Sequence, residues 1–149
     1  MKKSIIVLVS SFSFFVNADH DSKWPSGSAK YAIEHSVENT KKYKIKANKL
    51  MEEIFTKLDS KYHATAIKEQ ISAWDEFIDK TCNIVGISSG GGGSWSSTYH
   101  ARCEEGLSYD RYFATKNALK CIERVEKQTY ISRGEKLHCV VQTLNVKVF

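Results

Sequence analysis

The chain has 149 residues, of which 26% are charged and 42% are apolar, and its formal charge at neutral pH is +5. This length fits one ordinary domain with a core of its own. The mildly basic balance falls short of the concentrated positive charge that is typical of nucleic-acid binding. We therefore expect a single folded domain with no nucleic acid among its partners.

The first eighteen residues have the features of a secretory signal peptide in the right order. Lys2 and Lys3 form a positive start, residues 4–16 are uncharged and mostly apolar, and Val16-Asn17-Ala18 offers small residues at the cleavage positions. The apolar stretch is too short and too rich in serine for a membrane span. We predict that residues 1–18 are removed, that a single domain spans 19–149 with a charge of about +3, and that it is periplasmic or secreted.

The mature chain contains four cysteines, Cys82, Cys103, Cys121 and Cys139. An even number in an exported chain indicates disulfides, and no pair has the C-x-x-C spacing of a zinc site or a redox motif. Three pairings are open. We favour Cys82–Cys103 and Cys121–Cys139, because each of these pairs brackets a segment that has its own turn signal.

The first half of the chain has the periodicity of helices. After a polar start over residues 19–28, a helical pattern runs from about Ala29 to Tyr62. A second helix follows with Ile67, Ile71, Trp74 and Ile78 on one stripe. The polar residues around 60–63 allow either a helical hairpin or a continuous helix.

The second half begins with a glycine-rich stretch at 88–94, which cannot form the interior of a helix or a strand. A third helix is predicted from about Ala101 to Lys127. Beyond Gly134, apolar residues recur at even spacing from Leu137 to Val148, which predicts a short strand or an extended tail. The expected fold is mainly α: a helical hairpin and a long third helix, stapled by two disulfides, with a short C-terminal strand.

The residues of the mature chain do not form a recognisable catalytic or cofactor site. The glycine run lacks the lysine of a phosphate-binding loop, and the five histidines show no i, i+4 pairing, so we expect no nucleotide, no metal and no cofactor. Asp75, Glu76 and Asp79 could supply the carboxylate pair of a glycosidase. Their helical spacing favours a solvated face opposite the apolar stripe, so we expect that the protein is not an enzyme.

Two sets of residues are candidates for binding. Trp95 and Tyr99, with Ser94, flank the glycine run, and aromatic side chains on a mobile loop are common binding anchors. Lys42, Lys46 and Lys49 would form one stripe on a helix, which could meet anionic glycans, lipid head groups or an acidic partner. The alternatives are a plain surface loop and a plain solvated face.

A joint pattern of spacings identifies a family resemblance. Its members are Trp74, Phe77, Cys82, Gly92-Gly93-Ser94, Cys103, Leu107, Ser108 and Arg111. Over residues 65–115 the chain resembles the LprI N-terminal domain family, the lysozyme-inhibitor-like domains of exported bacterial proteins. The resemblance implies a periplasmic binding protein whose partner is a muramidase or another cell-wall-degrading enzyme.

The residues that carry this resemblance have structural roles that the sequence itself predicts. Trp74 and Phe77 should bury a large area between helices, and Leu107 belongs to the apolar face of the third helix. Arg111 lies on that same apolar face, where a buried guanidinium needs a carboxylate or carbonyl partner. The Cys82–Cys103 bridge should tie the second helix to the third across the glycine run.

Other functions remain open at this point. A charge of about +3 is not complementary to strongly basic animal-type lysozymes, so the target could be a less basic muramidase or a rival's secreted toxin, which would make the chain an immunity protein. A peptidoglycan-acting hydrolase that uses the Asp75 cluster and a structural envelope protein that uses the lysine stripe are the alternatives of other classes.

Overall fold

The computed structural model describes residues 23–58, 61–89, 93–130 and 134–143. These ranges contain four α-helices and no strand: α1 (Ala29–Lys57), α2 (Lys61–Ser88), α3 (Ser94–Val125) and α4 (Glu135–Thr143). The mainly α fold is therefore confirmed, and α1 and α2 are two separate helices. The predicted signal peptide, the glycines at 90–92 and residues 144–149 lie outside the described residues.

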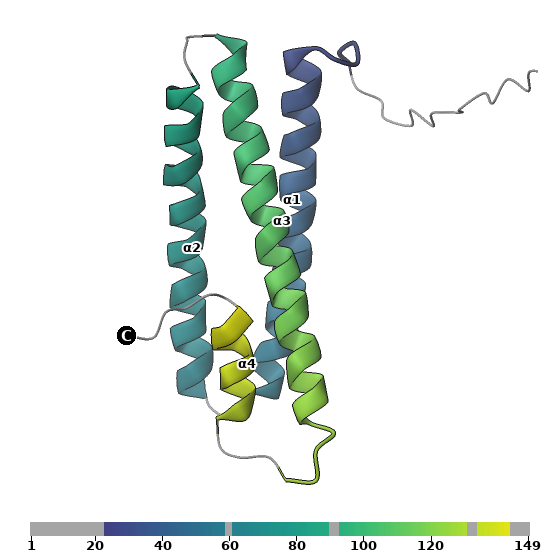
Figure 1. The fold of residues 1–149 in the computed structure, drawn as a ribbon, viewed down its shortest axis with the longest axis vertical. Helices are drawn as coiled ribbons and strands as arrows, with labels where there is room; N and C mark the ends of the chain where they lie inside the picture. Colours follow the sequence, from purple (N-terminus) through teal and green to yellow (C-terminus); the bar gives the residue numbers. More distant parts are fainter. Residues whose placement is uncertain (1–22, 59–60, 90–92, 131–133, 144–149) are drawn as a thin grey trace, which may run out of the picture.

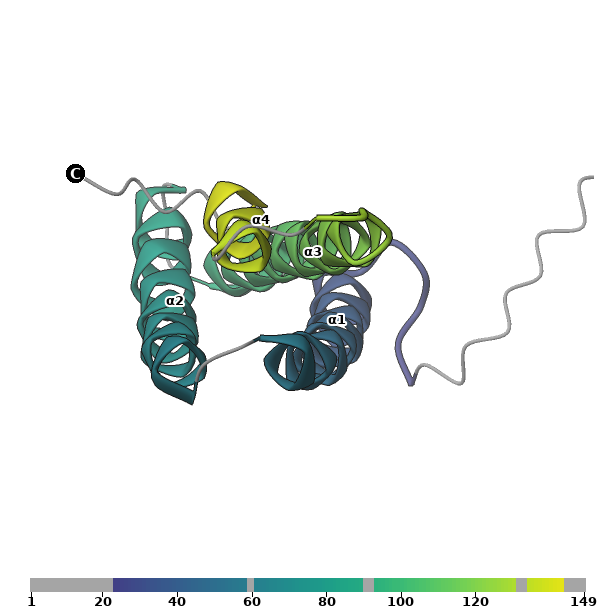
Figure 2. The same cartoon turned by 90° about the horizontal axis from the view of Figure 1, so that it is seen from below.

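The three long helices lie side by side, and the short α4 lies next to α3 at one end of the bundle (Figures 1 and 2). The chain reverses after α1 and again after α2, so that α1 and α3 run in the same direction (Figure 1). Helix α3 is the organising element, because it packs against α1, α2 and α4. We call the end where α2 finishes and α3 starts the glycine end, and the opposite end the α4 end.

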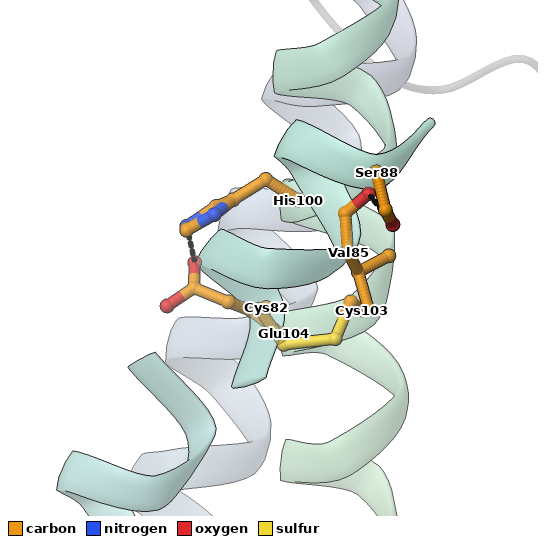
Figure 3. Close-up of a disulfide and its surroundings, with 6 residues drawn as sticks. All are labelled: Cys82, Val85, Ser88, His100, Cys103 and Glu104. Atoms are coloured by element: carbon orange, nitrogen blue, oxygen red, sulfur yellow. Dashed lines mark hydrogen bonds and ion pairs between the residues drawn. A yellow bond between two sulfur atoms is a disulfide. The ribbon is translucent and has the colours of Figure 1, made fainter. Parts of the chain in front are cut away.

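Both predicted disulfide pairs are confirmed. Cys82 and Cys103 join α2 to α3 near the glycine end with 5.4 Å between their Cα atoms (Figure 3). Cys121 and Cys139 join α3 to α4 with 5.6 Å between their Cα atoms. Each bridge therefore fastens one neighbouring helix to α3.

The apolar core lies toward the α4 end and draws on all four helices. Its buried members are Met51, Ile54, Ile67, Ala118, Leu119, Ile122, Cys139 and Val140. None of the helices in the described ranges is both long and apolar enough to cross a membrane. The core is thus built where α4 closes the bundle.

Helix α3 starts seven residues earlier than the expected Ala101. Gly93 directly before it has a φ of +105°, a conformation that glycine adopts without steric cost. The serine- and threonine-rich first turns remain helical because their hydroxyls find acceptors: Thr98 Oγ1 donates to the Ser94 carbonyl at 2.8 Å, and Ser96 Oγ donates to the Gly86 carbonyl at 2.7 Å. The polar composition of residues 94–100 therefore led to a predicted start of the helix that is too late.

The expected C-terminal strand is wrong for residues 135–143, which form α4. Cys139 and Val140 are both buried, with 2% and 1% of their surface exposed. Adjacent residues of a strand point to opposite faces, whereas one side of a helix can bury two neighbours. The even spacing of Leu137, Cys139 and Val141 was therefore a coincidence of composition, and Val146 and Val148 lie outside the described residues.

Candidate protein-binding face

The most unusual surface feature is a row of aromatic side chains along the outer face of α3. Its members are Trp95, Tyr99, Tyr109 and Phe113, which we call the α3 row, and their exposed fractions are 62%, 42%, 44% and 48%. Large aromatic residues usually bury most of their surface in a monomer, and exposed apolar patches mark binding sites. The row consists of two such patches, Trp95 with Tyr99 and Tyr109 with Phe113. The α3 row is therefore the leading candidate for a binding face.

The sequence suggested that Trp95 and Tyr99 lie on a loop. They lie instead on the first turns of α3. Their ring centroids are 6.3 Å apart, so the two rings pack against each other on the helix surface. A helix fixes the backbone of both residues, which lowers the entropy that a partner has to remove on binding. Ser94, the third residue of the predicted loop site, is the exposed first residue of the same helix.

Tyr109 and Phe113 were not predicted as binding residues, although the sequence contains a signal for them. They lie one turn apart on α3 with stacked rings 5.9 Å between centroids. Counting along α3, the positions 95, 99, 102, 106, 109 and 113 alternate steps of four and three residues. This spacing places six positions on one helical face.

Helix α1 adds one more aromatic side chain, Tyr43, to the face. The ring of Tyr43 meets that of Tyr109 edge-on at 5.2 Å and stacks with that of Tyr112 at 6.1 Å. The Lys46 ammonium lies 5.7 Å from the Tyr112 ring centroid, within the range of a cation–π contact. The aromatic surface of α3 is thus continuous with the edge of α1 that carries Lys46.

The predicted lysine stripe forms on α1. Lys42, Lys46 and Lys49 are all exposed and lie three and four residues apart, so they share one helical face. Within the described ranges none of the three ammonium groups makes an ion pair. Because Lys46 touches Tyr112, the stripe lies beside the aromatic surface, and the two candidate sets predicted separately belong to one side of the molecule.

A hollow of about 390 Å³ opens between α1 and α3 on this side. Tyr31 and His35 line it from α1, and Arg102 and Glu105 line it from α3. The amide nitrogen of Asn39 donates to Glu105 Oε1 at 2.7 Å and so holds that carboxylate in place. Arg102 lies on the same helical face as the α3 row, between Tyr99 and Tyr109. The hollow that it lines therefore lies alongside the middle of the row.

A second hollow, of about 320 Å³, lies among α1, α2 and α3 near the glycine end. It is lined by Ile33, Val37, Asn83, Gly86, Ser96, Ser97, His100, Ala101 and Glu104. Nε2 of His100 lies 3.7 Å from Glu104 Oε2, one turn along α3 and close to the Cys82–Cys103 bridge (Figure 3). Gly86 permits the close approach here, because a Cβ at that position would lie 3.2 Å from His100 Cβ and from the Ser96 carbonyl.

Arg111 has a structural role, as the sequence predicted, and its partners are now known. Its side chain is 4% exposed; one guanidinium nitrogen donates to Asp75 Oδ1 at 2.5 Å and the other to Asn48 Oδ1 at 2.8 Å. The guanidinium therefore links all three long helices. The Asp75 side chain keeps 44% of its surface exposed, and its pairing with Arg111 is a contact that the expectation of a plain solvated face did not include.

The other motif residues are divided between the interior and the surface. Trp74 and Leu107 are half-buried, but Phe77 is 51% exposed, so its expected burial is wrong. The centroid of the Phe77 ring lies 5.6 Å from that of the Trp74 ring. Phe77 is thus an exposed aromatic residue of α2 that does not belong to the α3 row.

The remaining acidic residues show ordinary surface chemistry. Lys80 Nζ donates to Glu76 Oε1 at 2.6 Å, and this hydrogen bond lowers the pKa of the Glu76 carboxyl. Asp79 is exposed. In the part of the chain that the structure describes, no three His, Cys, Asp or Glu side chains are grouped closely enough to hold a metal ion.

Comparisons of the chain with protein-family models, with curated proteins and with solved structures found no match. The resemblance to the LprI N-terminal domain family therefore stays a prediction from the motif residues.

Proposed function

We propose that this chain is an exported binding protein that inhibits or neutralises a cell-wall-degrading enzyme, with the α3 row as its docking surface. The observation that carries the proposal is the row of four rigidly held aromatic side chains that face solvent. Tyr and Trp are the residue types most enriched among interface hot spots, where they supply large contact area at low entropic cost.

The target class rests on the family resemblance and on the export signal. A muramidase fits both, and so does a secreted toxin that attacks the cell wall, in which case the protein confers immunity. Two disulfides are common in small exported domains. The charge of about +3 favours a target that is not itself strongly basic.

The test is inhibition and affinity measured with the exported full chain against purified muramidases of differing charge. Trp95→Ala should weaken binding to an inhibited enzyme by about 2 kcal/mol, in the hot-spot range. It should leave the thermal midpoint nearly unchanged, because Trp95 is 62% exposed. Phe77→Ala is the matched control, since it removes an exposed aromatic ring from α2 and should leave binding intact.

Three results would contradict the proposal. The first is that no muramidase or cell-wall toxin is inhibited. The second is that Trp95→Ala binds as well as the parent. The third is hydrolysis of purified peptidoglycan by the chain alone, which would assign it to the enzymes.

A further inference from the structure

We infer that the partner presents an amphipathic helix with acidic flanks, which lies along the α3 row and against the lysine stripe. This inference rests on the proposed function and specifies the chemistry of the partner's contact surface. Three observations support it: the spacing of the row, the charges beside it, and the hollow in its middle.

The spacing of the row suits a helical partner. From Trp95 to Phe113 the steps of four and three residues match the seam that one helix presents to another in a coiled coil. At about 1.5 Å per residue, the eighteen steps from Trp95 to Phe113 span roughly 27 Å, or five turns. Gly106 lies within the seam with no atom near the position of a Cβ, so a partner backbone can approach closely there.

The charged positions within the seam itself are all positive, and the acidic neighbours Glu105 and Asp110 lie next to it on α3. The same seam continues beyond Phe113 with Lys116 and Lys120, and Arg102 lies in its middle, while none of its eight positions is acidic. The lysine stripe of α1 adds three ammonium groups without ion pairs in the described residues. A partner with carboxylates along the flanks of its helix is electrostatically complementary to this surface.

The hollow gives the partner a place to anchor. It opens beside the gap in the row between Tyr99 and Tyr109, where Arg102 forms part of its lining. A side chain of an approaching helix can enter at that level, in the manner of a knob entering a hole. A carboxylate there would meet the exposed Arg102, while the Glu105 carboxylate of the same lining accepts a hydrogen bond from Asn39.

A second copy of this chain does not satisfy the same surface. In a two-fold contact the same patch faces itself, so the lysines of both copies would be brought into one interface. Like charges placed together in this way oppose association. An anionic polysaccharide would pair with the lysines, but its binding would not require aromatic rings at heptad spacing.

The experiment uses two synthetic helical peptides of 21 residues with the same leucine seam, one flanked by glutamates and the other by lysines. Their binding to the exported full chain is followed by tryptophan fluorescence at low salt. The glutamate peptide should bind at least about tenfold more tightly, and the preference should shrink as salt rises. Tyr109→Ala should lower the affinity for the glutamate peptide about tenfold, whereas Phe77→Ala should leave this affinity unchanged.

A pair of charge variants locates the partner's carboxylates. Lys46→Glu should lower affinity for the glutamate peptide about fivefold. Lys41→Glu makes the same change in net charge on another face of α1 and should have little effect. Equal binding of both peptides, or equal effects of the two lysine variants, would overturn the inference.

The outcomes also separate this inference from the proposed function. If a muramidase is inhibited through Trp95 but the peptides bind equally, the proposed function stands and the acidic helix is wrong. If the glutamate peptide binds as expected but no enzyme is inhibited, the surface chemistry stands and the proposed target class is wrong. Tight binding of heparin that survives Tyr109→Ala would identify a polysaccharide site and overturn the inference.

Discussion

The two ends of the bundle bury different kinds of side chain. Toward the α4 end the interior is apolar, with Met51, Ile54 and Ile122 among its members. From the glycine end to the middle of the bundle, the interior includes Ser36, Thr40, Thr98, Ser108, Arg111 and Thr115, all of them buried. In the same half, Trp95 and Tyr99 stand on the outside of α3. The half whose interior mixes these polar residues with Ile78, Cys82 and Ala101 thus exposes Trp95 and Tyr99.

This difference indicates that the two halves are held by different forces. The α4 end gains stability from the burial of apolar area, which is non-directional. The glycine end depends on specific ties: the Cys82–Cys103 bridge, the Arg111 contacts and the close approach at Gly86. A rigid scaffold whose aromatic residues stay outside the core suits a binding surface. Four measurements test whether the two ends of the bundle are held by different forces.

The largest effect is expected in the apolar core. Ile54→Ala removes a fully buried side chain from the α4 end and should lower the free energy of unfolding by about 4 kcal/mol, because transfer and cavity costs add. Urea titration followed by circular dichroism measures it. Ile84→Ala, on the exposed face of α2, is the control and should change stability by less than about 0.5 kcal/mol. Similar losses for both variants would contradict the location of the core.

The next effect concerns the glycine end. Replacing Cys82 and Cys103 together with alanine opens a loop of sequence separation 21 and should cost about 3 kcal/mol through loop closure. Amide exchange should rise mainly in the last turns of α2 and the first turns of α3. The matched variant without Cys121 and Cys139 should instead raise exchange in α4. Uniform loosening in both variants would argue against two separately fastened halves.

The helices and disulfide pairs could be predicted because their signals are local. Apolar residues at helical spacing defined α1 and α2, and the segments between cysteines indicated the pairing. Arg111 was also recognised as a buried charge in need of a partner. Its partner Asp75 was missed, because the spacing of Asp75 and Asp79 is equally compatible with a solvated face.

The candidate site was predicted in part. Trp95, Tyr99 and the lysine stripe were recognised from residue type, but Tyr109 and Phe113 were not. Periodicity identifies the apolar face of a helix but does not say whether that face points inward. In α3 the inner face carries Ser108, Arg111 and Thr115, so the usual relation between apolar character and burial fails there.

A smaller effect is expected at the Arg111 link, and its asymmetry is informative. Asp75→Ala leaves a guanidinium that is 4% exposed with only Asn48 as partner, and should cost about 2 kcal/mol. Arg111→Met leaves a carboxylate that is 44% exposed and can be hydrated, so it should cost less. Thermal melts of both single variants and of the double variant measure the coupling between the two residues. A greater loss in Arg111→Met would show that its packing matters more than its charge.

The smallest effect is expected from an ion cluster at the α4 end. Lys57 Nζ lies 2.9 Å from Glu126 Oε2, and Lys136 Nζ lies 3.3 Å from Glu126 Oε1, so one carboxylate joins the ends of α1 and α3 to α4. The hydrogen bond that the Lys57 ammonium donates to Glu126 lowers the pKa of the Glu126 carboxyl below the ordinary 4.5 and raises the pKa of Lys57 above the ordinary 10.5.

The signs of these two shifts define the pH range in which the cluster stabilises the fold. The lowered pKa of Glu126 contributes stability above pH 4.5, and this stability is lost as the pH falls through the folded-state pKa. The raised pKa of Lys57 contributes stability below pH 10.5, and this stability is lost as the pH rises through the folded-state pKa. Glu126→Gln should therefore melt slightly below the parent at pH 7, and the difference should close in acid, where the parent carboxylate is itself protonated. The exposed Glu52→Gln is the control at both pH values. A difference between Glu126→Gln and the parent that is as large at pH 2.5 to 3 as at pH 7 would mean that Glu126 acts through packing and not through its charge.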